Sequence, residues 1–335
     1  MDKALYYPNI NPPKGWTLRA LLYWDKIGTI VPQSYGTRDR FDSFTVKLIN
    51  QGILERVDPD DIWNVSNYQD SLIEAINKGD QLIQNSRINF QNGKCVRIHF
   101  EKFHYLVFDE LIKLKIANRE NSSDWLRVES NVAKLIMTFL ASVLSLEKDY
   151  QLTTDEIDSL DVSFNDLPND SYLSNIKDSN DVLTANLRTN ILEDLLPYPF
   201  DDDLKKIMRF KEKYHSELIS FRRKIERVIF EILLNSDPTK RERAYRRNIE
   251  EINEIKKELI AKMKNNNLNN IFFTGACGLL ATATPMIVEP QLIGIPALLH
   301  GLYAIYKETH KEKIENPIKY LALIETKFNY KNKPH

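Results

Sequence analysis

The sequence predicts an α+β or α/β N-terminal domain followed by an all-α C-terminal region. Short β-prone runs alternate with amphipathic helices over residues 1–150, whereas beyond residue 200 apolar residues recur at spacings of three and four, the helical period. A chain of 335 residues has room for two domains and a sizeable core. We therefore expect a mixed domain over 1–150, an acidic linker or surface loop over 151–195, and a helical domain over 196–335.

The opening of the chain predicts a strand, a helix and a second strand, the usual start of an α/β or α+β domain. A second helix that ends at Gly52, and then a third strand, are expected to follow. In chain order these five elements cover residues 4–10, 16–25, 27–31, 45–50 and 53–57.

The remainder of the first domain combines helices with short strands. Polar and apolar residues alternate over 95–100, with Arg97 and His99 on the polar face, as expected for a half-buried strand. The other elements expected here are helices over 69–83, 103–117 and 132–146, and a strand over 125–128.

The segment 153–181 is acidic and rich in turn-forming residues, with eight Asp and Glu against one Lys. A calcium-binding loop needs a central glycine, which this segment lacks. It is therefore predicted to be a solvated linker or surface loop.

Residues 201–265 predict two long helices joined by a short turn, which together form an antiparallel hairpin. Asp237 is expected to cap the second helix, with Pro238 at its first position. The start of that helix carries a basic cluster formed by Lys240, Arg241, Arg243, Arg246 and Arg247.

The most apolar part of the chain is the stretch 271–306, whose one formal charge is Glu289. It predicts an apolar helical hairpin with runs over 271–288 and 292–306. An 18-residue helix is about 27 Å long, marginal for a hydrocarbon core of about 30 Å. Burial in the protein or at an oligomer interface, and insertion into a membrane, both remain open. Small residues that permit close helix packing in either setting include Gly275, Gly278, Ala281, Gly294 and Gly301. A closing helix is expected over 314–328.

Composition indicates an ordinary soluble protein of a reducing compartment. The net charge of −1 provides no global attraction to nucleic acid or to anionic lipid. Cys95 and Cys277 occur in very different sequence contexts, so a disulfide between them is not expected. The N-terminus lacks the features of a signal peptide. A cytoplasmic location is expected, with membrane association if the stretch 271–306 inserts.

Sequence motifs predict no catalytic residue, cofactor or metal site. His99-x-Glu101 matches the first half of a zinc-deaminase signature, but the companion Pro-Cys-x-x-Cys is absent. HExxH and the glycine-rich nucleotide motifs are also absent. Tyr7 and Asp25 lie near strand and helix ends, where open α/β sheets bind ligands. With Arg97, His99 and Glu101 they are the candidate ligand-binding residues.

Several short motifs, spread over most of the chain, resemble an uncharacterised bacterial domain-of-unknown-function family. They are LYYPNI (5–10), LRALLYWDKIGTIVP (18–32), VRIHFEKFHYLVFDELI (96–112), WLRVESNVAKLIMTFLA (125–141), IMRFKEKYHSELISFRRKIE (207–226) and NPIKYLALIE (316–325). The resemblance implies a bacterial cytoplasmic protein with an N-terminal α/β and a C-terminal helical part. It implies no activity and no site residues.

Three hypotheses of function follow. The leading one is a non-enzymatic interaction protein, such as a bacterial stress or phage-defence component, whose apolar hairpin mediates homo-oligomerisation, contact with a protein partner, or conditional membrane contact. The second is a small-ligand sensor or an enzyme that uses the N-terminal domain. The third is a nucleic-acid binder that uses the basic cluster 240–247, which lacks a larger set of aromatic residues for base stacking.

Overall fold

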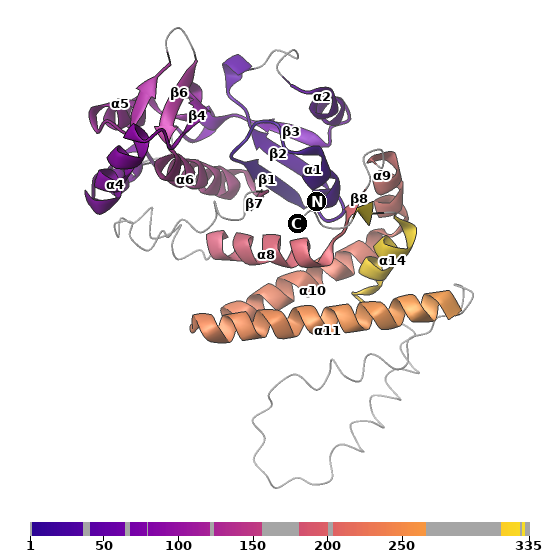
Figure 1. Ribbon diagram of the computed structural model, residues 1–335. Coiled ribbons are helices and arrows are strands. Elements are labelled where there is room, and N and C mark those ends of the chain that lie inside the picture. The colour runs from indigo at the N-terminus through magenta and orange to yellow at the C-terminus, as the bar shows by residue number, and fades with distance from the viewer. Residues whose placement is uncertain are drawn as a thin grey trace. The chain divides into compact units, whose positions relative to one another are not determined.

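The computed structural model describes residues 2–35, 41–63, 68–78, 80–120, 124–155, 181–199, 204–265, 316–328 and 330–331 (Figure 1). The chain forms two compact units. Unit 1 consists of Met1–Arg209 with Tyr330–His335, and unit 2 of Phe210–Asn329.

Unit 1 is built on a four-stranded parallel sheet with the strand order β3-β2-β1-β7. Leu5 of β1 pairs with Gly28 of β2 on one side and with Leu152 of β7 on the other. Most residues of the two inner strands are buried, as parallel strands covered on both faces require. The strands are β1 (Lys3–Tyr7), β2 (Lys26–Ile30), β3 (Leu54–Val57) and β7 (Gln151–Thr154).

Two helices connect the first three strands. α1 (Lys14–Ala20) joins β1 to β2, and α2 (Ser43–Asn50) joins β2 to β3. Asp42 begins α2 by accepting a hydrogen bond from the Thr45 backbone N–H at 2.8 Å. After β3 the chain leaves this sheet and returns as β7 on the opposite side of β1. The direction of strand addition therefore reverses between β1 and β7.

The long excursion between β3 and β7 forms a second, antiparallel sheet with the order β4-β6-β5. Its strands are β4 (Cys95–His99), β5 (Ala117–Arg119) and β6 (Trp125–Glu129). The accompanying helices are α3 (Tyr68–Lys78), α4 (Asp80–Gln91), α5 (Tyr105–Lys113) and α6 (Ser130–Lys148). Short 3-10 turns η3 (Pro59–Ile62) and η4 (Phe100–Lys102) complete the excursion, whereas a further turn, η1 (Gln33–Tyr35), lies between β2 and α2.

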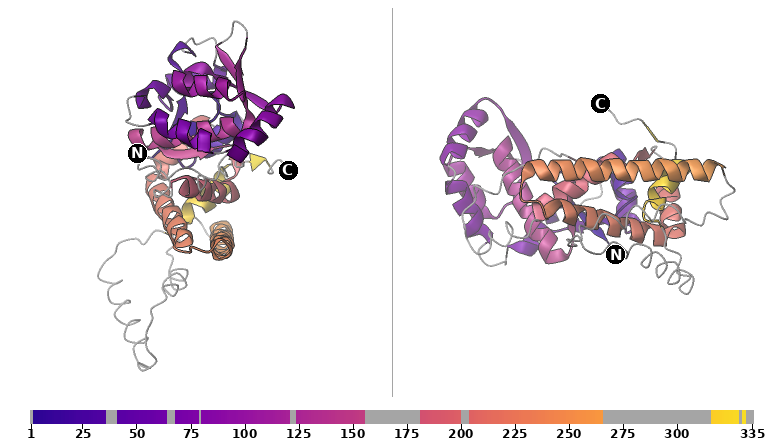
Figure 2. Two further views of the ribbon diagram at one scale, coloured as in Figure 1. Left: turned by 90° about the vertical axis from the view of Figure 1, so that its left-hand side faces the viewer. Right: turned by 90° about the horizontal axis from the view of Figure 1, so that it is seen from below.

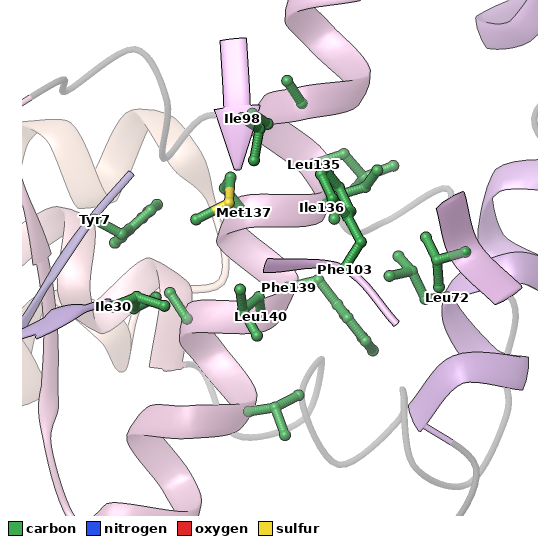
Figure 3. Close-up of a cluster of buried hydrophobic side chains, with 14 of the residues drawn as sticks. Tyr7, Ile30, Leu72, Ile98, Phe103, Leu135, Ile136, Met137, Phe139 and Leu140 are labelled. Carbon is green, nitrogen blue, oxygen red and sulfur yellow. The ribbon is translucent and has the colours of Figure 1, made fainter. Parts of the chain in front are cut away.

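Helix α6 is the centre of the core, because it contacts strands of both sheets. Figure 3 shows Ile136, Met137, Phe139 and Leu140 of this helix among buried side chains from other elements. In the part of the chain that the structure describes, α6 is the one helix long and apolar enough to cross a membrane. Most of it is buried inside the protein, so its place in the core accounts for its apolar composition.

Gly28 on β2 lies where a side chain does not fit. An added Cβ would be 2.8 Å from Tyr150 Cε1 and 3.0 Å from Val57 Cγ2. The Tyr150 ring is held in place, because its hydroxyl donates to Glu55 Oε2 at 2.8 Å. Overpacking of this kind lowers stability by about 1–3 kcal/mol.

We predict that Gly28→Ala lowers the free energy of unfolding of unit 1 by about 2 kcal/mol. Gly15→Ala is the matched control, since the nearest atom to its added Cβ is 3.9 Å away; its stability should be unchanged or slightly raised. Tryptophan fluorescence in urea measures both variants, because all four tryptophans of the chain belong to unit 1. Equal effects of the two substitutions would refute the steric argument.

Unit 2 contains α10 (His215–Leu233), α11 (Pro238–Asn265) and α14 (Lys319–Lys327), which pack against one another. α10 and α11 run side by side in every view (Figure 2). Phe221 of α10 stacks on Tyr320 of α14 with ring centroids 5.7 Å apart. Ion pairs tie α14 to both long helices: Lys319 to Glu217 at 2.8 Å and Lys256 to Glu325 at 2.9 Å.

The remaining elements are α8 (Asp181–Leu195), β8 (Tyr198–Pro199), α9 (Leu204–Lys213) and β9 (Tyr330–Lys331). β8 and β9 form a two-stranded antiparallel sheet. Arg19 of α1 is buried against this region, 3.2 Å from Glu193 and 4.1 Å from the centre of the Tyr198 ring.

The predicted fold class is confirmed at the level of an N-terminal part with mixed sheets and a helical C-terminal part. The predicted cap is also confirmed, since Asp237 accepts from the Thr239 N–H at 2.8 Å. The first of the two predicted long helices is divided into two helices in the structure. The chain departs from helical geometry at Tyr214, with φ −115° and ψ 36°, and this break separates α9 from α10.

Several predicted boundaries also differ. The first strand ends at Tyr7, before Pro8, because proline has no N–H for a strand ladder. The predicted linker 151–195 contains β7 and α8, whereas residues 156–180 lie outside the described residues. The apolar stretch 271–306 also lies outside them.

Candidate functional site

A cavity of about 410 Å³ lies in unit 1 between the segment that follows β1, the strand β4 and the first turns of α6. Figure 3 shows three residues of its wall, Tyr7, Ile98 and Met137, which come from three different elements. The described residues of the wall are Tyr7, Pro8, Asn9, Ile10, Asn11, Tyr35, Val96, Arg97, Ile98, His99, Lys102, Trp125, Ser130, Ala133, Lys134 and Met137.

The strand order explains the position of the cavity. Tyr7 is the last residue of β1, and strands are added in opposite directions on the two sides of β1. In open α/β sheets, ligands bind outside the carboxyl ends of the strands at such a reversal. The segment after β1 is fixed there, since Thr29 Oγ1 donates to the Ile10 carbonyl at 2.8 Å.

Lys102 is the most unusual residue of the wall. Its side chain enters the protein from η4, it is 4% exposed, and its Nζ donates to the Pro8 carbonyl at 2.8 Å. Among the described residues no carboxylate forms an ion pair with it. Burial disfavours the charged form and lowers the pKa of Lys102 to about 7. At neutral pH this amine therefore exists in both protonation states.

Two further basic side chains line the cavity. Arg97 is at the rim, with its side chain 60% exposed and paired with Glu120 at 2.8 Å. Lys134 is half-buried on α6, and no carboxylate of the described residues forms an ion pair with it. No Asp or Glu occurs among the described residues that form the wall. The described part of the wall therefore carries an excess of positive charge.

One side of the cavity is aromatic. His99 and Trp125 meet edge to face at 5.4 Å, and Tyr35 lies 6.3 Å from Trp125. The Arg97 guanidinium lies 5.2 Å from the centre of the Trp125 ring, within the range of a cation–π contact. Asn11 adds a polar group, because its Oδ1 is buried and accepts no hydrogen bond from the residues that the structure describes.

Glu129 holds the α6 part of the wall in place. This fully buried carboxylate accepts from the Asn131 and Val132 backbone N–H groups, both at 2.9 Å, and from Asn89 Nδ2 at 3.3 Å. It thus provides the hydrogen-bond acceptor that the backbone N–H groups in the first turn of α6 need, and α6 carries Lys134. The Glu129 carboxylate binds these N–H groups at the start of the helix, and Glu129 is not a residue of the cavity wall.

Of the five candidate ligand residues, Tyr7, Arg97 and His99 lie together in the cavity wall. Glu101 is adjacent without lining it, and accepts from the Ser34 N–H at 3.1 Å. Asp25 is elsewhere, because it precedes β2 and therefore lies at the amino end of the parallel sheet, where it accepts from the Asp2 N–H at 3.2 Å.

Sequence reasoning missed Lys102, Lys134, Trp125 and Asn11. Lys102 gives a weak signal, a lysine between Phe100 and Phe103 at a strand–helix junction. No sequence pattern distinguishes Lys134 from any other lysine on an amphipathic helix. These residues come together only through the excursion between β3 and β7.

An acidic group lies near Glu101, on the turn η3. Burial, and then the charges of Asp58, Glu101 and Asp61, raise the pKa of Asp60 to about 6. Within the described part of the chain, no three His, Cys, Asp or Glu side chains are grouped so that they could hold a metal ion.

The other candidate residues are remote from the cavity in sequence. The basic cluster Lys240, Arg241, Arg243, Arg246 and Arg247 lies on the first turns of α11, where Arg246 pairs with Glu242 at 2.7 Å. The hairpin residues Gly275, Gly278, Ala281, Gly294 and Gly301 lie outside the described residues.

Fold and cavity together define a mixed α/β protein with a helical C-terminal part and a basic, partly aromatic cavity at the reversal of its parallel sheet. The chain belongs to DUF6236, a family of unknown function, which matches residues 78–329. The matched region includes Arg97, Lys102, Trp125 and Lys134 of the cavity wall. No curated protein and no solved structure matches the chain. The predicted resemblance to an uncharacterised family is thus confirmed.

Proposed function

We propose that unit 1 binds a small organic anion in this cavity and acts as a ligand sensor or an enzyme. The proposal is based on the charge of the wall. Its described residues include three basic side chains and no carboxylate. A group of like charges in a partly enclosed, low-dielectric site attracts ligands of opposite sign.

The basic residues contribute differently. Arg97 already shares its charge with Glu120, whereas Lys134 pairs with no carboxylate of the described residues. Lys134 is therefore expected to provide the main attraction, with Arg97 adding a planar, multidentate donor at the rim. Lys102 at the buried end adds charge whenever it is protonated.

The rest of the wall indicates the shape of the ligand. A volume of about 410 Å³ is within the range of small-molecule sites. Trp125, Tyr35 and Met137 favour an apolar or planar group beside the acidic one. The buried Asn11 Oδ1 favours a hydrogen-bond donor on the ligand.

We predict that organic anions raise the unfolding temperature of unit 1, whereas their neutral analogues do not. Benzoate against benzamide, and adenosine 5′-monophosphate against adenosine, are suitable pairs, followed through tryptophan fluorescence. A ligand at a hundredfold excess over its Kd stabilises the folded state by about 2.7 kcal/mol.

The variant that tests the site is Lys134→Met, which should lose this response. Lys113→Met is the matched control, because Lys113 lies on α5 of the same unit with its side chain 74% exposed. A full response in Lys134→Met, or equal responses to anions and neutral analogues in the unmodified protein, would contradict the proposal.

We infer a second function from the sequence of the apolar stretch 271–306, which contains one formal charge. Assembly or conditional membrane contact through this stretch remains our proposal for it, together with a role in stress response or phage defence. Replacing both Gly278 and Ala281 with leucine should lower the oligomer mass or the membrane-bound fraction, because larger side chains prevent close helix packing. Light scattering and membrane fractionation measure these quantities, and unchanged values of both would count against the proposal.

A further inference from the structure

We propose that Lys102 forms an imine with an aldehyde or ketone carbonyl of the organic anion. This inference rests on the proposed anion site and names the chemistry that the site would perform. The ligand class is an organic acid that also carries a reactive carbonyl group.

The position of the amine supports this assignment. Lys102 is 4% exposed and lines the cavity, and its Nζ is held 2.8 Å from the Pro8 carbonyl. Among the described residues no carboxylate is present to keep it charged. A lysine desolvated in this way is a common form of activated amine nucleophile.

The protonation state of the Lys102 amine also supports imine formation. Only the neutral amine attacks a carbonyl, and burial lowers the pKa of Lys102 to about 7. At pH 7 its neutral fraction is therefore on the order of a thousandfold larger than that of an ordinary lysine. The two other basic residues of the wall, Lys134 and Arg97, provide positive charge for the acid group of the ligand.

The reaction balances without a metal or an oxidant. The Lys102 nitrogen attacks the carbonyl carbon and a C–N bond forms. The carbonyl oxygen takes up two protons, equal in number to those that the amine gives up, and leaves as water when the C–O bond breaks. Tyr7 and His99, which line the same cavity, are the residues that we assign to the relay of these protons.

The test uses 4-formylbenzoate as the probe and cyanoborohydride to reduce the imine to a stable secondary amine. Intact-mass and peptide mass spectrometry of the full chain should find one principal adduct, on Lys102. Neutral benzaldehyde should label the same site at least tenfold more slowly. The adduct should be absent from Lys102→Arg and Lys102→Met, and retained in Lys113→Met.

The outcomes separate the two proposals. Labelling spread over surface lysines with Lys102 unmodified, while calorimetry still detects binding of benzoate or 4-formylbenzoate in the cavity, would overturn the imine and leave the anion site intact. Absence of both binding and adduct would overturn the anion site itself. Because Lys102→Arg keeps a basic group and Lys102→Met does not, agreement between the two variants excludes loss of charge as the cause.

Discussion

Replacing Lys102 with methionine should stabilise the ligand-free protein at and below neutral pH, and the gain should disappear as the pH rises. In the folded protein the pKa of Lys102 is lowered to about 7, whereas in the unfolded chain it has the ordinary lysine value of about 10.4. Between these values the unfolded state binds more protons than the folded state. Stability of the unmodified protein therefore rises with pH across this window, by up to about 1.4 kcal/mol per pH unit from this group.

Lys102→Met lacks this contribution, so the difference in unfolding free energy between the two proteins should be largest at pH 7 and below and should shrink toward pH 10. Urea unfolding followed by tryptophan fluorescence at several pH values between 6 and 10 measures this difference. The unfolding free energy of Lys113→Met should vary with pH in the same way as that of the unmodified protein, since the Lys113 side chain is 74% exposed. A difference between Lys102→Met and the unmodified protein that does not vary with pH would show that the Lys102 amine is not desolvated.

Replacing Glu129 with alanine should lower the free energy of unfolding of unit 1 by about 3 kcal/mol, the sum of a lost helix cap and of buried N–H groups left without partners. The carboxylate accepts from the Asn131 and Val132 N–H groups, both at 2.9 Å, and is fully buried. Because Lys134 of the cavity wall directly follows this turn on α6, anion binding should weaken as well.

Glu129→Gln is the matched control, as its amide oxygen keeps one acceptor in the same place. Its loss of stability should be about 1 kcal/mol, because a neutral acceptor bonds less strongly than a carboxylate. Urea unfolding and the anion-dependent rise in unfolding temperature measure both variants. If Glu129→Ala and Glu129→Gln lowered the unfolding free energy equally, the charge of Glu129 alone would explain the effect. That result would contradict the capping role.

The sequence was sufficient for features that depend on local pattern. The alternation over 95–100 predicted the strand β4, and Asp237 with Pro238 predicted the start of α11. The two faces predicted for β4 are wrong, because Val96 is exposed and His99 is fully buried. Tyr7, Arg97 and His99 were predicted as ligand residues, and the structure places all three in one cavity. The prediction was wrong for Asp25, because ligands bind only at the carboxyl ends of parallel strands. Asp25 precedes β2 and lies at the opposite end of the sheet from Tyr7.

The features that the sequence did not predict depend on contacts between distant segments. Lys102 reaches the Pro8 carbonyl across 94 residues of chain, and its burial follows from that contact. Tyr214 belongs to an unbroken helical pattern in the sequence, yet its backbone leaves the helix. The Tyr214 side chain makes no capping hydrogen bond at that break.

Whether the cavity of unit 1 binds an organic anion can be determined from a crystal structure of the full chain with the tightest-binding anion from the thermal unfolding pairs. We expect density for the anion between the segment after β1 and the first turns of α6, with its acid group within hydrogen-bonding distance of Lys134 or Arg97. An empty cavity, with the anion bound instead at the basic cluster 240–247 of α11, would contradict it.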